Sequence, residues 1–269
     1  MGGLLHLTGY PDRPPVRPGV IISDYLTGIF NALSVMIALY HRDRPARRPA
    51  DGENPSEGHP SGGRGQVIDL ALYASVLRIL EHTVAAYDRL GIVRGREGNR
   101  LANSAPLDNW ETSDGQYVSI VAAGDGLFPR LARLIGRPEL PDDPRFAKLA
   151  ARVRHSDEIN AIVASWCRGR TAAEIERLCL EAEVPFARCY DVADICADPQ
   201  IRARGDLVRV EDPVLGPILM QGLHAHFSET PGAVRTGAPR LGEHNEEIYG
   251  ELLGLGPQEI AKLREEGVI

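Results

Sequence analysis

The sequence lacks paired cysteines, an excess of positive charge and a long uninterrupted apolar run. Its four cysteines form no Cys-x-x-Cys pair, and their spacings match no common zinc signature, so we expect free thiols and no metal ligands. The formal net charge of −7 argues against nucleic acid as the main partner, because binding to phosphate backbones depends on Lys and Arg.

Apolar length gives no sign of a membrane segment. We find no stretch approaching the roughly 20 apolar residues that span a bilayer. Residues 1–6 do not combine a basic start with an apolar core, so a signal peptide is not indicated. We therefore expect a cytoplasmic protein without membrane contact. With 269 residues, 43% of them hydrophobic, the chain is long enough for one large or two modest domains with a substantial core.

A strongly apolar segment follows Asp24 and continues to Tyr40. Its apolar residues recur at helical spacing, at Leu26, Ile29, Phe30, Leu33 and Ile37. Asp24 stands where a side chain caps such a helix by accepting backbone N–H bonds. Because the helix is apolar on most sides, we expect it to be buried.

The segments on either side of this helix are less apolar and richer in glycine and proline. Residues 1–20 are rich in glycine and proline, which predicts an extended segment. Residues 42–63 combine arginines with Pro, Gly and acidic residues and have few apolar side chains, which is typical of a mobile surface loop. The apolar residues 70–90 predict one helix, with Asp69 as its cap.

The remaining sequence alternates helices and strands. Asp114-Gly115 predicts a tight turn between two strands, and Thr171 with Glu174 has the spacing of a capping box. Further helices are predicted at 128–135, 156–166, 172–183, from 198, 245–253 and 257–266, and antiparallel strands between 207 and 227 around Gly216-Pro217. This mixture indicates an α/β or α+β protein.

Seven short patterns then follow one another along almost the whole chain. They are Pro14–Gly19 leading to Ser23-Asp24-Tyr25 and Gly28; Gly63–Asp69; Gly98-Asn99-Arg100 continuing to Pro106; Asp114–Tyr117 followed by Gly124–Phe128; Asp143–Phe146 with Arg152; Val184-Pro185 followed by Asp198–Gln200; and Ala238–His244. Each pattern alone is weakly specific. Together, in this order, they resemble the class III coenzyme A transferases of the CaiB/BaiF type.

The resemblance implies an α/β fold with a Rossmann-like large domain, an inserted small α+β domain and two interlocked chains. On that pattern, residues 1–104 are the remaining part of the large domain, 105–200 the small domain and 201–269 the return to the large domain. The family segment that supplies most CoA contacts has no counterpart before Met1. We therefore expect a homodimer or a separate chain carrying this N-terminal part, and the activity of this chain alone is doubtful.

The resemblance also implies a reaction, in which CoA moves from an acyl thioester to a carboxylic acid through an anhydride and a thioester on one aspartate. Asp24 stands at the position of that nucleophile. CoA and acyl-CoA are substrates, and no cofactor is bound permanently. Gly28, one helical turn on, either lets substrate approach closely or is a packing glycine. Gly98, Asn99 and Arg100 match a loop over the active site that binds CoA, with an ordinary connection as the alternative.

Two other functions remain open at this stage. A non-catalytic partner or scaffold subunit would retain the fold without turnover. A 2-methylacyl-CoA racemase-like enzyme is disfavoured, because Gly124 stands where the racemases carry a glutamate and their histidine would fall before Met1.

Overall fold

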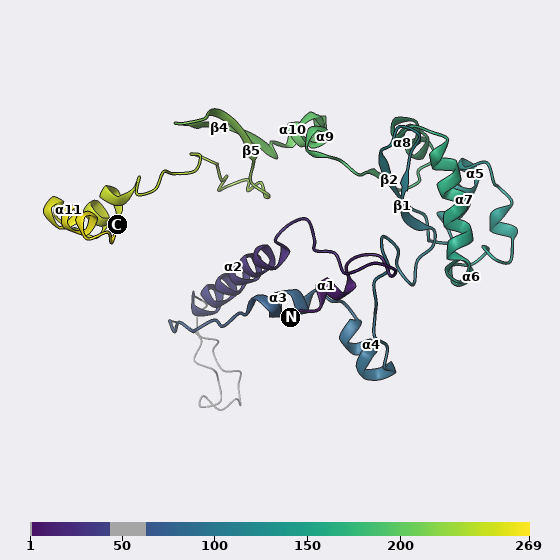
Figure 1. Ribbon diagram of the computed structural model, residues 1–269, viewed down its shortest axis with the longest axis horizontal. Coiled ribbons are helices and arrows are strands. Elements are labelled where there is room, and N and C mark those ends of the chain that lie inside the picture. Colours follow the sequence, from purple (N-terminus) through teal and green to yellow (C-terminus); the bar gives the residue numbers. More distant parts are fainter. Residues whose placement is uncertain (1, 44–62) are drawn as a thin grey trace, which may run out of the picture. The chain divides into compact units, whose positions relative to one another are not determined.

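The structure is a computed structural model that describes residues 2–43 and 63–269 (Figure 1). The predicted loop 42–63 falls almost wholly outside the described residues, and its first two residues instead continue a helix. By its contacts, the chain divides into two compact units, residues 1–189 and 190–269. The mixed helix and strand content agrees with the expected fold class, whereas the domain boundaries at 104 and 200 stay predictions.

Near the start of the chain, two glycines let the backbone before α1 pack closely against α3 and the residues that follow it. Helices α1 (Leu4–Leu7), α3 (Leu72–Arg78) and α4 (Thr83–Leu90) belong to this part. A Cβ on Gly2 would lie 2.9 Å from Val76, and one on Gly3 would lie 2.8 Å from Leu80, so only glycine permits this contact. The predicted extended segment 1–20 therefore contains a short helix, and Val76 and Leu80 become buried beneath it.

The single helix predicted for residues 70–90 is wrong, and so is its cap. The chain interrupts the helix between Arg78 and Thr83, where Glu81 adopts a φ of 54°. Helix α3 starts after Ala71, so Asp69 does not cap it. The burial of Leu80 accompanies the interruption, and a regular helical pattern in the sequence does not foresee such a tertiary contact.

Helix α2 (Ile22–Asp43) departs from prediction in three ways. It begins at Ile22, so Asp24 lies inside the first turn and is not the cap. None of its residues is buried, although its apolar sequence predicts a buried helix. Its 22 residues also include a stretch long and apolar enough to cross a membrane, by length and composition alone. The expectation that no stretch meets this criterion was therefore wrong.

Residues 105–189 form the best-packed part of the chain. Strands β1 (Leu107–Glu111), β2 (Tyr117–Val121) and β3 (Phe186–Arg188) make an antiparallel sheet in the order β1-β2-β3. The turn predicted at Asp114-Gly115 is confirmed, with Gly115 at a φ of 73°. Around the sheet lie α5 (Phe128–Leu134), the 3-10 turn η1 (Leu140–Asp142), α6 (Leu149–Arg154), α7 (Ser156–Arg168) and α8 (Ala172–Glu181). Their apolar faces build one core, which includes Trp110, Val118, Ile120, Phe128, Leu131, Ile159, Val163, Trp166 and Ile175.

One arginine lies fully inside this core. The side chain of Arg152 has no exposed surface, and its guanidinium donates to the carbonyls of Ala105 (3.1 Å), Phe146 (2.7 Å) and Ala123 (2.6 Å). It also donates to the Asp125 carboxylate at 2.8 Å. Buried charge is tolerated only where hydrogen bonds replace water, and here the guanidinium has four partners. Arg152 thereby joins α6 to three other segments of this region, at Ala105, at Ala123 with Asp125, and at Phe146.

Capping in this region follows the sequence closely. Thr171 accepts the N–H of Glu174 at 3.3 Å, and the Glu174 carboxylate accepts the N–H of Thr171 at 2.8 Å, so the predicted capping box is confirmed. The helix predicted to stop at Gly136 does so, because Gly136 adopts a φ of 73°. Such local bonds join residues three or four positions apart, which explains why sequence foresees them.

The second unit, residues 190–269, is smaller. It contains α9 (Val192–Ala197), α10 (Pro199–Arg204), β4 (Leu207–Asp212), β5 (Gly216–Gln221), the π-helix η2 (Glu246–Leu252) and α11 (Pro257–Glu265). β4 and β5 pair antiparallel, as predicted, but the turn precedes Gly216 and does not include Gly216-Pro217. Asp198 caps α10 by accepting two backbone N–H groups, at 2.8 and 2.9 Å.

Candidate active site

Asp24 lies exposed in the first turn of α2. The hydroxyl of Ser23 donates to its carboxylate at 3.2 Å, and Thr27 in turn donates to the Ser23 carbonyl at 2.8 Å. The unpaired N–H groups at a helix N-terminus stabilise a negative charge within the first turn. Asp24 is therefore an accessible carboxylate at the N-terminal end of a long helix.

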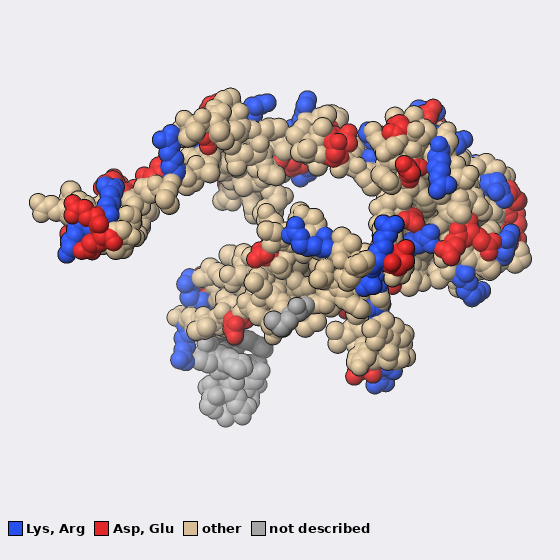
Figure 2. Space-filling view, viewed as in Figure 1, with Lys and Arg blue, Asp and Glu red and all other residues tan. Residues whose placement is uncertain are grey.

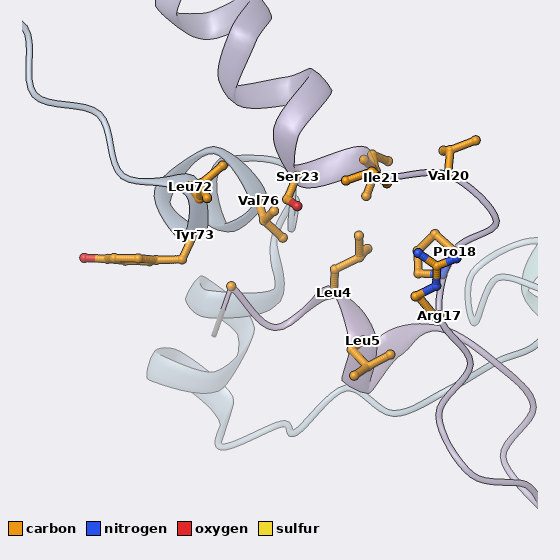
Figure 3. A pocket seen from close by; sticks show the side chains of 12 residues that line it. Leu4, Leu5, Arg17, Pro18, Val20, Ile21, Ser23, Leu72, Tyr73 and Val76 are labelled. Carbon is orange, nitrogen blue, oxygen red and sulfur yellow. The ribbon is translucent and has the colours of Figure 1, made fainter. Parts of the chain in front are cut away.

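An apolar hollow of about 450 Å³ lies beside this turn (Figure 3). Ser23, the neighbour of Asp24, is on its wall, while Asp24 itself is not. The other walls come from α1, from the segment before α2 and from α3, and they comprise Gly2, Leu4, Leu5, Arg17, Pro18, Val20, Ile21, Ile22, Leu72, Tyr73 and Val76. An apolar hollow with few polar groups suits the aliphatic part of a small ligand.

Arg17 supplies the positive charge of the hollow. Figure 3 shows it beside Pro18, at the side of the hollow where the chain approaches Val20 and Ile21. Among the described residues Arg17 forms no ion pair or hydrogen bond. A guanidinium presents planar N–H donors that match a carboxylate. The hollow thus combines apolar walls with one group that can bind an anion.

Gly28 follows Asp24 by one turn on the same face of α2. A Cβ built at Gly28 meets no atom within 4 Å, so no contact among the described residues requires glycine there. The space beside Gly28 is open to an incoming group, and the role of this residue in binding stays a prediction.

Gly98 and Asn99 pack against the segment that precedes α2. The N–H of Gly98 donates to the Gly9 carbonyl at 2.9 Å, and the Asn99 amide donates to the Tyr10 hydroxyl at 3.1 Å. A Cβ on Gly98, whose φ is 65°, would lie 2.7 Å from the Tyr10 ring. The structure therefore packs this loop against the segment that leads to α2. The contacts of Gly98 and Asn99 are with Gly9 and Tyr10 and do not include Asp24.

Arg100 has other partners. Its Nε donates to Asp108 at 2.8 Å, and another of its nitrogens donates to Asp157 at the start of α7. The hydrogen bond that Arg100 donates to the Asp108 carboxylate raises the pKa of the guanidinium. Arg100 thus joins the loop to β1 and to the start of α7. Binding of CoA through this side chain would require it to share or exchange these two carboxylates.

Other candidate groups give no second site. Among the described residues, no three His, Cys, Asp or Glu side chains are grouped so as to hold a metal ion. Glu243 and His244, neighbours at the end of the Ala238–His244 pattern, have separate partners: Glu243 accepts the N–H of Arg240, and His244 contacts Glu247. Gly124 accepts the backbone N–H of Leu127 in the turn before α5 and presents no carboxylate.

Comparison with known proteins identifies the class of this chain. The CoA-transferase family III matches residues 1–245, and the chain belongs to that family. A crystal structure of a CaiB/BaiF family protein from Brucella suis superposes on 93% of this chain with a TM-score of 0.72 and 31% identity, and this chain covers 60% of it. The expected fold class is therefore confirmed.

Two relatives come from Chloroflexus aurantiacus. One is a succinyl-CoA–D-citramalate CoA-transferase, 39% identical over 269 residues, which cover all of this chain and 63% of the relative. The other is the beta subunit of a succinyl-CoA–L-malate CoA-transferase, 37% identical over 272 residues, which cover all of this chain and 63% of that subunit. The chain thus spans slightly under two thirds of the length of the relatives that it matches.

Sequence patterns did not predict the hollow or the presence of Arg17 in its wall. Its walls come from residues as far apart as Leu4, Arg17 and Val76, which no local spacing connects. The one signal was the position of Arg17 between Pro14–Val16 and Pro18, within the pattern that leads to Asp24.

Proposed function

We propose that this chain carries the reacting carboxylate of a CoA transferase, which moves CoA from an acyl-CoA thioester to a carboxylic acid, and that Asp24 is this carboxylate. The observation that supports it best is the exposed position of Asp24 in the first turn of α2, beside an apolar hollow, in a chain of the CoA-transferase family III. Gly28, Gly98, Asn99 and Arg100 are proposed to bind the CoA part of the substrate.

The reaction balances with one aspartate as nucleophile. The Asp24 carboxylate attacks the thioester carbonyl, and CoA leaves as thiolate, which yields a mixed anhydride. The thiolate attacks the aspartyl carbonyl, releases the donor acid as carboxylate and leaves an aspartyl-CoA thioester. The acceptor carboxylate then attacks this thioester, and CoA thiolate leaves again. Attack of the thiolate on the acceptor acyl carbon forms the product and restores the Asp24 carboxylate.

The hollow supports dicarboxylic acids as the substrate class. Succinyl-CoA, D-citramalate and L-malate, named for the relatives, all carry a second carboxylate beyond a short carbon chain. In this chain the apolar walls would enclose the carbon chain, and Arg17 would bind the distal carboxylate through charge-assisted hydrogen bonds. We infer succinyl-CoA as the donor and a four- or five-carbon dicarboxylic acid as the acceptor.

Trapping the acyl intermediate tests the nucleophile. The chain is incubated with succinyl-CoA, alone and together with the stretch of the D-citramalate relative that it does not span, and hydroxylamine is added. We expect a hydroxamate on Asp24 by peptide mass spectrometry. Asp24→Asn should remove it and lower kcat by about ten-thousand-fold, whereas Asp43→Asn, at the other end of α2, should change neither.

A hydroxamate on another residue, or none in the combined protein, would reject Asp24 as nucleophile. The second outcome would favour a non-catalytic partner subunit, a role that fits the separate alpha and beta subunits named for the L-malate enzyme. Light scattering of the same samples distinguishes a homodimer from a complex with the added stretch.

Substrate specificity tests Arg17 separately. Arg17→Ala should raise KM for L-malate by about tenfold, because a hydrogen bond to a charged group contributes about 1.5 kcal/mol or more. KM for a monocarboxylic acid of the same length should stay unchanged. Arg13→Ala removes a guanidinium from the same segment that does not line the hollow, and it serves as the matched control.

A further inference from the structure

The side chain of Ser23 links the apolar hollow to the proposed nucleophile. Ser23 lines the hollow, whereas Asp24 does not, and the Ser23 Oγ donates a hydrogen bond to Oδ2 of Asp24 at 3.2 Å. Tyr73 also lines the hollow, but Figure 3 shows its hydroxyl pointing away from Ser23. The Ser23 hydroxyl therefore lies between the wall that would enclose an acyl chain and the carboxylate that would react with it.

The first turn of α2 holds Ser23 in this position. The Thr27 hydroxyl donates to the Ser23 carbonyl at 2.8 Å, and the N–H of Ile22 donates to the Val20 carbonyl at 3.0 Å. These bonds fix the backbone on both sides of Ser23. Ser23 is partly exposed and Asp24 is exposed, so a substrate can approach both residues.

Asp24 is the only carboxylate that α2 offers to this hydroxyl. The helix sequence contains no other Asp or Glu before Asp43, which lies at its far end. In Figure 2 the surface over the middle of α2 is correspondingly free of acidic and basic side chains, which gather towards its ends. Within this helix, the Ser23 hydroxyl therefore has no second carboxylate to bind.

The bond to Oδ2 gives the two carboxylate oxygens different tasks in the proposed reaction. When Oδ1 attacks the thioester carbonyl, Oδ2 becomes the carbonyl oxygen of the mixed anhydride. The CoA thiolate then attacks the Asp24 Cγ, the electron pair of the carbonyl moves onto Oδ2, and collapse of this tetrahedral intermediate expels the donor acid together with Oδ1. Attack of the acceptor carboxylate on the aspartyl thioester again places the negative charge on Oδ2, and CoA thiolate leaves.

This charge makes the Ser23 hydrogen bond stronger during the reaction than before it. In the free carboxylate the negative charge is shared by two oxygens, whereas each tetrahedral intermediate concentrates it on Oδ2. The separation of 3.2 Å exceeds the usual hydroxyl-to-oxygen distance of about 2.7–2.8 Å, so the bond can shorten as the charge develops. A donor that binds the intermediate more tightly than the ground state lowers the barrier.

We propose that Ser23 is a catalytic residue that stabilises the oxyanion on Asp24 Oδ2 in the two steps in which the aspartyl carbonyl is attacked. This role rests on the proposed function, in which Asp24 is the nucleophile. In the other two steps the attack is on the acyl carbon of the donor or the acceptor, and the oxyanion forms on the acyl oxygen instead. Loss of the Ser23 hydroxyl should therefore slow one half of the reaction and spare the other.

A single-turnover measurement separates the two halves. The full chain, combined with the stretch of the D-citramalate relative that it does not span, is mixed with an equal amount of succinyl-CoA and quenched at intervals. Mass spectrometry of the protein and its peptides distinguishes a succinyl group from CoA on Asp24. The unsubstituted chain should carry CoA and release succinate rapidly.

Ser23→Ala should still be acylated, but the succinyl group should accumulate on Asp24 and succinate should be released about 100-fold more slowly. This is the low end of the effect of losing one oxyanion donor, because Ser23 is partly exposed. Ser23→Thr keeps a hydroxyl and should restore most of the release. Ser34→Ala removes a hydroxyl from a partly exposed residue of the same helix that does not line the hollow, and it should change neither step.

The outcomes distinguish a failure of this role from a failure of the proposed function. If the unsubstituted chain carries no adduct on Asp24, both are rejected. If adducts form on Asp24 but Ser23→Ala leaves succinate release unchanged, or slows acylation and release equally, only the role of Ser23 is rejected. Ser23→Thr that is as slow as Ser23→Ala would reject it too.

Discussion

Replacing Arg152 by Ala should strongly destabilise the domain formed by residues 105–189. The guanidinium is fully buried and donates to the carbonyls of Ala105, Phe146 and Ala123, and its central carbon lies 4.3 Å from the centre of the Phe128 ring. Alanine removes every one of these contacts and supplies no donor. Three carbonyl groups in buried residues would then lose their partner at once.

The size of the effect follows from these groups. Each buried acceptor left without a partner costs about 1–3 kcal/mol, and loss of the ring contact adds to this. Partial relaxation and entry of water reduce the sum, so we expect the free energy of unfolding to fall by about 4 kcal/mol. Asp125 adds little, because its side chain is half exposed and regains water. A loss of this size is a large share of the stability of an ordinary domain.

Urea denaturation followed by tryptophan fluorescence measures this directly, because both tryptophans, Trp110 and Trp166, lie in the core of this domain. Arg145→Ala is the matched control. Arg145 contacts Asp143 and Glu158 at the surface, where such pairs contribute under about 1 kcal/mol. If Arg152→Ala lowered the free energy of unfolding by no more than Arg145→Ala does, the hydrogen bonds of the buried guanidinium would not contribute the expected stability.

Two further predictions concern the same domain. Thr171→Ala should lower the free energy of unfolding by about 1 kcal/mol, because it removes half of the capping box at the start of α8; an unchanged urea midpoint would contradict this. Burial raises the pKa of the Cys167 thiol to about 12 and that of Cys179 to about 11, so both stay protonated well above pH 8. Iodoacetamide at pH 8 should therefore label exposed Cys189 in the native protein and spare Cys167 and Cys179 until urea is added, and rapid native labelling of either buried thiol would refute the packing.

Local structure in this chain was largely predictable. The turn at Asp114-Gly115, the capping box at Thr171 and the start of α10 at Asp198 each depend on bonds between residues at most four positions apart. A side chain of the right type at the right spacing is then sufficient to predict the element. Family membership was predictable for a related reason, since it rests on the order of such short patterns.

What failed depended on contacts across the sequence. Helix α2 starts two residues before Asp24, so a good capping residue is not the cap. The predicted helix 70–90 breaks near Glu81, where Leu80 is buried under Gly3. The fully buried guanidinium of Arg152 satisfies carbonyls up to 47 positions away. Propensity and spacing describe neither the burial of Leu80 nor the bonds of Arg152, because each requires distant segments to meet.

Helix α2 carries both the proposed nucleophile, Asp24, and a large exposed apolar surface. A sequence this apolar predicts burial, and the described residues leave every one of its side chains at least partly exposed. The chain covers 63% of the D-citramalate transferase, so its relatives contain further polypeptide against which such a helix can pack. It follows that Asp24 and the apolar side chains of α2 make separate demands on one helix. As the proposed nucleophile, Asp24 needs an open face for substrate, whereas the exposed apolar side chains of Tyr25, Ile29 and Leu33 gain free energy when they are covered.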